Sequence, residues 1–570
     1  MSENFDTPVL IAGGGPVGLA LALELDRLGI DATLVERNLT TTRHPKMDIT
    51  NGRSMEIFRR LGVVDELRTV AVPSDHPVSV IWLSNLVGDE LTRFDYPSVD
   101  EARQRLRDKN DGTMALEPSM RVSQVLLEPV LKEMLETRCD HIDVRFGWGL
   151  EALTQDEDGV SATIKSTESG EEQTIRCQYL AGCDGAGSVA RNALAIPVNT
   201  ITPLDVLESE DRTDYLDDYR GEPPADAPRS EPRYMIHFRS PRKDLFERFG
   251  IAWHLQCPVS WSVIAQDDID TWTVHFPPWL YPNLDEEEDP RKILYHLFGT
   301  EFECEVLVNN RWYPRLGLAD SYGEGRVWLA GDSVHQVIPT GGYGMNSGMG
   351  DAMGLAWVLA ANVKGWGGET LFKAYESERR HVAARNRLAS GRHSAIRLKI
   401  RQATPENLTE QGPEADAARA KLGDYIQELG NLENDAWGIE WGYRYDDSPA
   451  ICHESGEAPA YEWEYYEPST WPGVRPPNVF LPDGQPLFDL FGLGFTLLRF
   501  EPLPCEHILA AAEAAGVPLD VVDIEDPHAA SLYQRKLVLV RPDQHVGWRG
   551  DEAPASLADA NNIIDRLRGA

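Results

Sequence analysis

The sequence predicts a multidomain α/β protein, and three observations support that prediction. The chain has 570 residues, more than one hydrophobic core normally serves, so two or three domains are expected. It opens with a strand, a glycine-rich turn, a helix and a second strand, all within residues 9–36. Two later apolar strand patterns, over 179–182 and 327–330, each lead into an aspartate that lies beside a glycine.

The opening unit has the Rossmann-like βαβ pattern. Residues 9–12 are apolar enough for a buried parallel strand, 19–29 form a helix that ends at a glycine, and 32–35 form a second strand. The loop between, 13–18, fits G-x-G-x-x-G. The first glycine allows the tight turn, the second lets a pyrophosphate approach the backbone, and the third lets helix and strand pack closely. The residues expected to bind the nucleotide phosphates are Gly13, Gly15, Pro16 and Gly18.

An acidic residue follows the second strand. Glu36 is placed to accept hydrogen bonds from both ribose hydroxyls, and Arg37 beside it is a further candidate contact. A carboxylate here disfavours a 2′-phosphate, so the site is expected to hold FAD or NAD rather than NADP.

The two later strand patterns end at Asp184 and Asp332. An aspartate at a strand end is well placed to accept a hydrogen bond from a sugar-like hydroxyl. Beyond Asp332 a glycine-rich stretch leads into a helical pattern from Ser347 to about Leu359. Backbone N–H groups at a helix start can bond the N1 and O2 edge of a flavin ring and favour its anionic reduced form. The candidate contacts in this stretch are Pro339, Gly342, Gly344, Met345 and Asn346.

In this order and spacing, the three motifs resemble those of the class A flavoprotein monooxygenases, the family of p-hydroxybenzoate hydroxylase and phenol hydroxylase. The resemblance implies that the first motif binds the ADP half of FAD, that Asp184 lies near the FAD and the nicotinamide path, and that Asp332 binds the ribityl chain. Arg121 and Gln124 match the family's helix beside the flavin phosphate and ribityl region. The implied reaction uses NADH or NADPH and O2, and hydroxylates a phenolic or similar aromatic ring through a flavin C4a-hydroperoxide.

The C-terminal part is similar to the phenol and 2,4-dichlorophenol hydroxylase branch, which carries a C-terminal thioredoxin-like domain. The chain has no C-x-x-C pair, so a dithiol redox role is excluded and a structural or dimer-supporting role is expected. Residues 205–232 are expected to form a surface loop. The expected domains are FAD-binding over 1–75, 105–190 and 315–400, substrate-binding over 76–104 and 191–314, a helical linker over 401–470, and thioredoxin-like over 471–570.

Asp48 is the candidate catalytic base. Phenol hydroxylase has an acid in a similar motif, five residues before an arginine that corresponds to Arg53, whereas the dichlorophenol branch tends to a histidine there. A base beside the ring hydroxyl generates the more nucleophilic phenolate. Because Asp titrates at about 3.9 and a phenol at about 10, either burial must raise the pKa of Asp48 or a partner must lower that of the phenol. A helix cap or an ion pair with Arg53 is the alternative role. Further substrate-pocket candidates are His335, Tyr234 and His254.

Composition excludes several partners. The formal net charge of −38 argues against nucleic acid and anionic membranes, and indicates a surface adapted for solubility or a cationic protein partner. No run of 18 apolar residues occurs, and the acidic start lacks a signal-peptide pattern, so a cytoplasmic protein is expected. Seven cysteines without C-x-x-C spacing predict neither a metal site nor a disulfide framework. A homodimer is the habit of the family.

Three alternatives share this fold. A flavin halogenase is disfavoured because the Trp-x-Trp-x-Ile-Pro signature is absent from the sequence. A Baeyer–Villiger-type or other natural-product oxygenase, and a protein that binds FAD without catalysis, are kept as alternatives, since fold alone does not fix function.

Overall fold

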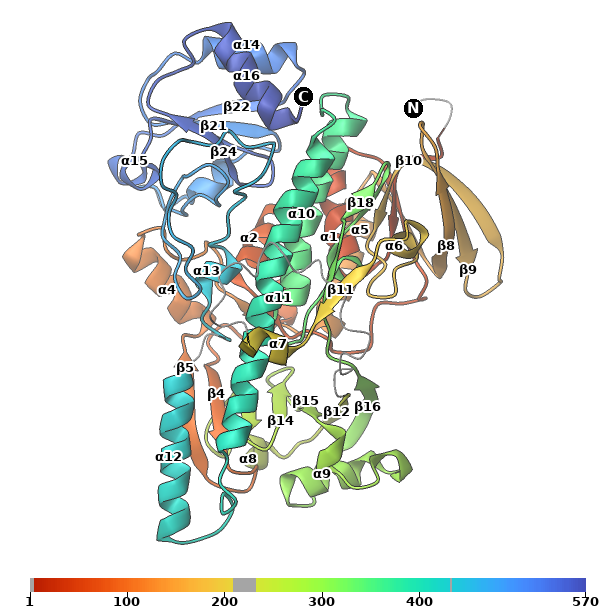
Figure 1. The fold of residues 1–570 in the computed structure, drawn as a ribbon, viewed down its shortest axis with the longest axis vertical. Helices are drawn as coiled ribbons and strands as arrows, with labels where there is room; N and C mark the ends of the chain where they lie inside the picture. The colour runs from red at the N-terminus through yellow and green to blue at the C-terminus, as the bar shows by residue number, and fades with distance from the viewer. Residues whose placement is uncertain (1–4, 209–231, 431–432) are drawn as a thin grey trace.

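The computed structural model describes residues 5–208, 232–430 and 433–570. Figure 1 shows three regions, two side by side at the upper end and one at the lower end. The nucleotide-binding sheet lies at the right and the C-terminal elements gather at the upper left. A second sheet occupies the lower end, and the long helix α11 (Leu371–Ala403) extends from the upper regions toward it.

The first sheet has eight strands and the path β18-β19-β10-β1-β2-β7. Strand β1 pairs in parallel with β10 and β2, and β10 pairs in parallel with β19. The carboxyl ends of these parallel strands therefore meet at one edge, where Rossmann-like folds bind nucleotides. The strands are β1 (Thr7–Ala12), β2 (Ala32–Glu36), β7 (Ile142–Phe146), β8 (Trp148–Gln155), β9 (Val160–Ser166), β10 (Glu172–Gly182), β18 (Gly323–Glu324) and β19 (Val327–Leu329).

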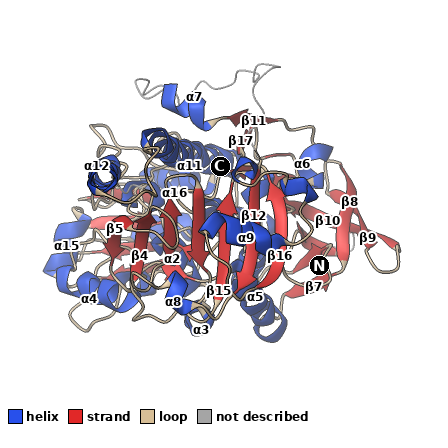
Figure 2. Cartoon of the chain, turned by 90° about the horizontal axis from the view of Figure 1, so that it is seen from below, coloured by secondary structure: helices blue, strands red, loops and turns tan. Residues whose placement is uncertain are grey.

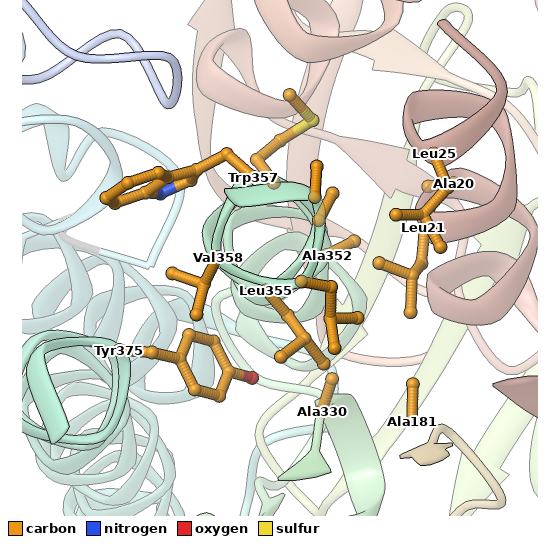
Figure 3. Close-up of a cluster of buried hydrophobic side chains, with 14 of the residues drawn as sticks. Ala20, Leu21, Leu25, Ala181, Ala330, Ala352, Leu355, Trp357, Val358 and Tyr375 are labelled. Carbon is orange, nitrogen blue, oxygen red and sulfur yellow. The ribbon is translucent and has the colours of Figure 1, made fainter. Parts of the chain in front are cut away.

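Three helices packed on this sheet form its core: α1 (Pro16–Arg27), α5 (Gln124–Arg138) and α10 (Tyr343–Val363). Figure 3 shows α1 side chains, including Leu21, beside α10 side chains, including Leu355, with Ala181 and Ala330 of the sheet region below them. Helix α10 is buried on nearly all sides, which is why its sequence is apolar around the whole circumference. The expected strand–helix–strand unit is confirmed, with the helix beginning at Pro16 rather than Leu19.

The second sheet has seven strands in the order β16-β12-β15-β14-β13-β4-β5. Figure 2 shows it from the lower end, with α8 (Lys243–Phe246) and α9 (Pro290–Phe298) on the near side. Alternation along β13 places Leu255 in the aromatic core beneath α9 and turns His254 to the opposite face. The strands are β4 (Val78–Leu83), β5 (Glu90–Tyr96), β12 (Arg233–Arg239), β13 (His254–Cys257), β14 (Trp261–Ala265), β15 (Thr271–Phe276) and β16 (Glu305–Trp312).

The C-terminal domain has a four-stranded sheet of order β22-β21-β23-β24, flanked by helices. One pair, β21 and β22, is parallel and the others are antiparallel. This is the mixed α/β domain expected at this end, and all seven cysteines are free thiols. The elements are β21 (Phe495–Arg499), α14 (Glu506–Ala514), β22 (Leu519–Asp523), α15 (Pro527–Tyr533), β23 (Leu537–Val540), β24 (Val546–Gly550) and α16 (Leu557–Arg568).

The connecting elements complete the description. The segment expected to be a helical linker holds α12 (Pro413–Leu429) and α13 (Trp437–Glu440), but residues 441–470 contain no helix. Helix α7 (Pro203–Glu208) begins the expected 205–232 loop, whose remainder lies almost entirely outside the described residues. The other named elements are β3 (Ile49–Thr50), α2 (Gly52–Arg60), α3 (Val64–Val70), α4 (Val99–Lys109), β6 (Met120–Arg121), α6 (Val189–Ala193), β11 (Val198–Ile201), β17 (Leu316–Ala319) and β20 (His335–Gln336).

Within the described ranges, none of the helices combines the length and hydropathy needed to cross a bilayer. The same residues contain no cluster of three or more His, Cys, Asp or Glu side chains arranged to hold a metal ion.

Candidate active site

The three glycines of the first loop differ in their surroundings. Gly13 has φ +112°, and a Cβ there would lie 2.3 Å from the carbonyl oxygen of Cys183. A Cβ on Gly18 would lie 2.0 Å from the carbonyl oxygen of Gly13. A Cβ on Gly15 would meet nothing within 4 Å. The first and third glycines therefore serve the packing of the chain itself, whereas the second faces open space beside the N-terminus of α1, where a pyrophosphate fits.

The ribose-binding acid adjoins this loop. Glu36 Oε2 accepts a hydrogen bond of 2.8 Å from the backbone N–H of Gly14, and Oε1 accepts one of 2.9 Å from that of Asn38. These bonds hold the carboxylate at the end of β2, where its remaining lone pairs can accept from hydroxyls. Arg37 is exposed next to it, and Pro16 is the first residue of α1.

Two further carboxylates keep acceptor capacity. Asp184 Oδ2 accepts hydrogen bonds from the backbone N–H groups of Val189 (2.6 Å) and Ala190 (3.1 Å), while its Oδ1 is buried without a partner. Asp332 is open to solvent, yet enough protein surrounds its carboxyl that burial raises its pKa. A buried acceptor without a donor is costly, so Asp184 Oδ1 suits a hydroxyl of a bound sugar-like chain, and the solvent-facing Asp332 carboxyl is free to accept from another. The residues at this edge of the sheet fit FAD.

The start of α10 is held against strand β3. Gly342 caps the helix with φ +66°. Asn346 accepts a 3.0 Å hydrogen bond from the backbone N–H of Asn51 and donates to the carbonyl oxygens of Gly342 (2.7 Å) and Ile49 (3.2 Å). Because the side-chain amide of Asn346 already bonds to protein groups, only the backbone of Asn346 is left to contact a flavin. Half-buried Gly344 and Met345 leave the N–H groups of the first turn available.

Arg121 and Gln124 have different neighbours. Gln124 begins α5 and donates a 2.6 Å hydrogen bond from Nε2 to Glu128. Arg121 donates a 2.8 Å hydrogen bond to the carbonyl oxygen of Ala265 in β14, and its Nε has no partner. Burial lowers the pKa of Arg121 to about 10, and it lines a large cavity beside Asp48. Gln124 therefore bonds within its own helix, whereas Arg121 lies on the wall of the cavity.

That cavity, of about 820 Å³, lies between the nucleotide-binding region and the second sheet. One wall carries Pro339 and Gly342 of the expected flavin loop, and another carries the face of β13–β15 opposite α9. Trp437 and Trp441, stacked with ring centroids 5.5 Å apart, form part of a third wall. A cavity that joins the expected flavin loop to a sheet face is the arrangement of a substrate site.

Asp48 faces this cavity and is ionised. Its Oδ2 accepts a 2.5 Å hydrogen bond from Trp253 Nε1 and lies 3.7 Å from His254 Nε2. Burial alone would raise the pKa of Asp48, but His254, Trp253 and Arg121 together outweigh it and hold the pKa below its ordinary value. Of the two routes expected from the sequence, a pKa of Asp48 raised by burial is wrong, because the donors around the carboxylate stabilise its charged form; a partner that lowers the pKa of the phenol stays a prediction. The alternative of an ion pair with Arg53 is also wrong, since Arg53 pairs with Glu56, and Asn51 caps α2.

His254 is joined to a line of polar groups on the cavity wall. Its Nδ1 lies 3.3 Å from Gln256 Nε2, and the side-chain oxygen Oε1 of Gln256 accepts a 2.5 Å hydrogen bond from the Ser262 hydroxyl. Arg397 donates to the same Ser262 oxygen at 3.3 Å and pairs with Glu433 at 2.7 Å. His254 Nε2 has no hydrogen-bond partner and lies beside Asp48. One nitrogen of the imidazole is thus held by the protein while the other is available to a ligand.

Two of the three substrate-pocket candidates lie elsewhere. His335 is fully buried and bonds Asp351 at 2.7 Å, and it does not line the cavity. The Tyr234 hydroxyl accepts a 3.0 Å hydrogen bond from Asn309 Nδ2, and Tyr234 does not line it either. The structure places neither side chain in the cavity. Tyr234 lies on a strand whose cavity-facing side the sequence does not show, and His335, chosen because it follows Asp332, contacts Asp351 instead. His254 does line it, as does His275, whose pKa burial lowers to about 4.

Sequence reasoning missed Trp253, Gln256 and Arg397. Gln256 lies two residues after His254 on the same strand, so once one faces the cavity the other must too. Trp253 was recognisable as an aromatic residue in a strand pattern, but its hydrogen bond to Asp48 joins residues 205 positions apart.

The comparisons with known proteins agree with this geometry. Residues 6–389 match the family described as FAD binding domain, and residues 469–569 match that described as aromatic-ring hydroxylase, C-terminal. The nucleotide edge and the substrate cavity together define a flavin-dependent oxygenase architecture. The chain belongs to the class A FAD-dependent aromatic-ring hydroxylase family.

Relatives and solved structures extend over the whole chain. It is 36% identical to the FAD-dependent monooxygenase apdD of Emericella nidulans, covering 98% of this chain and 90% of that protein. It is 29% identical to phenol 2-monooxygenase of a Pseudomonas species, covering 99% and 93%. The rebeccamycin biosynthetic enzyme RebC with reduced flavin matches with a TM-score of 0.83 at 32% identity, covering 99% of both chains. The monooxygenase PieE, solved with FAD and substrate, matches with a TM-score of 0.83 at 27% identity, again over 99% of both.

The protein is thus a flavoprotein monooxygenase that acts on aromatic substrates, with FAD as its cofactor and NAD(P)H and O2 as co-substrates. The hydroxylase interpretation of the sequence is confirmed, and an FAD-binding protein without catalysis is disfavoured.

Proposed function

We propose that the enzyme hydroxylates an aromatic ring whose existing hydroxyl group binds between Asp48 and His254. The observation that carries this proposal is the 3.7 Å separation of Asp48 Oδ2 and His254 Nε2, which is too long for a hydrogen bond and faces the cavity. A hydroxyl group placed near both would donate its proton to the ionised carboxylate, and its oxygen would accept a hydrogen bond from His254 Nε2–H. A phenol provides both a donor and an acceptor for this position.

The roles divide as follows. Trp253 fixes Asp48, and Asp48 accepts the hydrogen bond of the ring hydroxyl and takes its proton as the general base. Because Gln256 Nε2 donates to His254 Nδ1, the neutral imidazole carries its proton on Nε2, which would donate to the ring oxygen and stabilise the phenolate. FAD, bound along the glycine loop, Glu36, Asp184 and Asp332, supplies the oxygen-activating chemistry.

A Baeyer–Villiger reaction is less compatible with this site. Its ketone substrate offers no donor to Asp48, so the ionised carboxylate would lie against a carbonyl oxygen of like partial charge. Ring hydroxylation therefore fits the polar groups of the cavity better than a Baeyer–Villiger reaction does.

The size of the cavity favours a substrate of several fused or linked rings. Pockets of roughly 300–1,000 Å³ bury drug-sized ligands, and this one has about 820 Å³. A flavin ring at Pro339 and Gly342 would fill only one end. A single phenol would leave the rest to water, which opens routes for reducing equivalents to escape as hydrogen peroxide.

We also propose the domain limits stated from the sequence, a homodimer and a cytoplasmic location. The sheet residues 78–96 and 233–312 support the split substrate-binding domain. The family's habit supports the dimer.

The test replaces the carboxylate. An Asp48→Asn variant should form hydroxylated product about 100-fold more slowly, because general acid–base groups contribute about 10²–10⁴ in rate. FAD content should be unchanged, and more of the NADH consumed should appear as hydrogen peroxide. Asp95→Asn is the matched control, since Asp95 bonds Ser79 and does not line the cavity. Equal product yields from wild type and Asp48→Asn would contradict the proposal.

A further inference from the structure

A chain of buried charged groups joins the C-terminal domain to the expected flavin loops. We infer that the turn Arg541–His545 of the C-terminal domain positions these loops, so that the domain contributes to FAD affinity without touching FAD. The inference rests on the FAD site described above and adds a task for the C-terminal domain beyond simple packing.

The first link joins this turn to helix α11. Arg541 is fully buried and donates two hydrogen bonds to the Glu378 carboxylate, of 2.6 and 2.8 Å. It also pairs with Asp543 at 2.5 Å. Glu378 is 2% exposed at its side chain and also accepts from Ser448. Loss of Arg541 would leave Glu378 and Asp543 as buried carboxylates without their shared cation, so the position of α11 depends on it.

The next residue of α11 continues the chain to the flavin loop. Arg379 Nε donates a 2.9 Å hydrogen bond to Asp351 Oδ1, and its Nη1 lies 3.2 Å from the Tyr445 hydroxyl. Asp351 Oδ2 accepts from the backbone N–H of Gly331 at 3.0 Å and lies 2.7 Å from His335 Nε2. Gly331 directly precedes Asp332, the expected ribityl ligand. Asp351 thus sets the conformation of the turn that presents Asp332.

A second link starts from the same turn. Gln544 Oε1 and the carbonyl oxygen of Asp543 accept hydrogen bonds from Arg53 of α2, at 2.9 and 3.0 Å. Helix α2 is capped by Asn51, whose backbone N–H bonds Asn346 at the start of α10. The turn therefore reaches both loops expected around the flavin, one through α11 and one through α2. The two buried links therefore hold both loops in place relative to the turn Arg541–His545.

The experiment compares two arginines of the same domain. Arg541→Met removes the buried link, whereas Arg499→Met removes an exposed ion pair with Asp523 and is the control. FAD affinity is measured by titrating the apoprotein, and hydrogen exchange of the apoprotein reports the Gly331 amide. Arg541→Met should raise the FAD Kd at least tenfold and accelerate exchange at Gly331. Arg499→Met should change neither by more than twofold.

An Asp351→Asn variant tests the last link separately. It should accelerate exchange at Gly331 and weaken FAD binding while exchange in strands β21–β24 stays at the wild-type rate. If Arg541→Met is too unstable to purify, Arg541→Lys keeps the charge without the two-pronged bond and should give an intermediate Kd. Unchanged FAD affinity and unchanged Gly331 exchange in a folded Arg541 or Asp351 variant would overturn the inference. Neither readout involves a substrate, so failure here is distinct from failure of the proposed hydroxylation.

Discussion

Gly15 and Gly18 lie in one loop but should respond oppositely to alanine. Gly15 has φ −78° and ψ −178°, a conformation that any residue adopts, and its Cβ would meet no protein atom within 4 Å. Gly15→Ala should therefore leave the stability of the apoprotein unchanged. If the FAD pyrophosphate occupies that space, the added methyl group meets the cofactor instead. Overpacking of one methyl-sized group costs about 1–3 kcal/mol, which corresponds to a rise of about 5- to 150-fold in the FAD Kd.

In Gly18→Ala the added methyl group would clash with the protein itself. Its Cβ would lie 2.0 Å from the Gly13 carbonyl oxygen, far inside contact distance and against backbone that cannot rotate away. The apoprotein itself should lose stability, measured by thermal unfolding with and without FAD. The reasoning fails if Gly15→Ala binds FAD as tightly as wild type, because the pyrophosphate would then lie elsewhere. It also fails if the two variants melt at the same temperature as apoproteins.

Two further predictions concern pH. Burial lowers the pKa values of His275, His393 and His545 to about 4, so between pH 6.5 and 4 the unfolded chain binds more protons than the folded one. The free energy of unfolding should thus decrease as the pH is lowered through this window, by up to about 1.4 kcal/mol per pH unit for each histidine. Denaturation midpoints that do not change between pH 6.5 and 5 would contradict this. Glu440 works in the opposite direction, because burial, aided by Asp435, raises its pKa to about 8. In the folded protein Glu440 holds a proton that the unfolded chain releases above about pH 4.5, so the wild type loses stability as the pH rises from 5 to 8. Glu440→Gln should therefore become more stable relative to wild type over this range. An equal difference in the free energy of unfolding at pH 5 and pH 8 would refute the raised pKa.

The nucleotide edge was predictable because its determinants are local. The strand, the glycine loop, the helix and Glu36 fall within residues 7–36, and each glycine has a backbone reason readable from spacing. The positions of Asp184 and Asp332 at that edge follow from parallel pairing of β1, β10 and β19, which buried strand patterns indicate. The cofactor could therefore be inferred from the amino-acid sequence alone.

The substrate cavity was less predictable because it is assembled from distant segments. Asp48 was found only through a motif, and its ionisation depends on Trp253 and His254, about 205 residues away. His335 and Tyr234 were assigned to the pocket from their neighbourhood in sequence, whereas strand orientation and the Asp351 contact decide their positions. The buried link between Arg541 and Glu378 likewise spans 163 residues and leaves no local signal.

The most direct test of the central claim is a single-turnover reaction under ¹⁸O2 with NADH or NADPH and a panel of hydroxylated aromatic compounds of one to four rings. The account predicts that a multi-ring phenol gains one ¹⁸O atom, with little hydrogen peroxide, and that a one-ring phenol yields mostly peroxide. Efficient labelling of the one-ring phenol alone would contradict the inference from cavity size. Absence of ¹⁸O from the ring of every hydroxylated compound, or its recovery in an ester formed from a ketone, would contradict the hydroxylation itself.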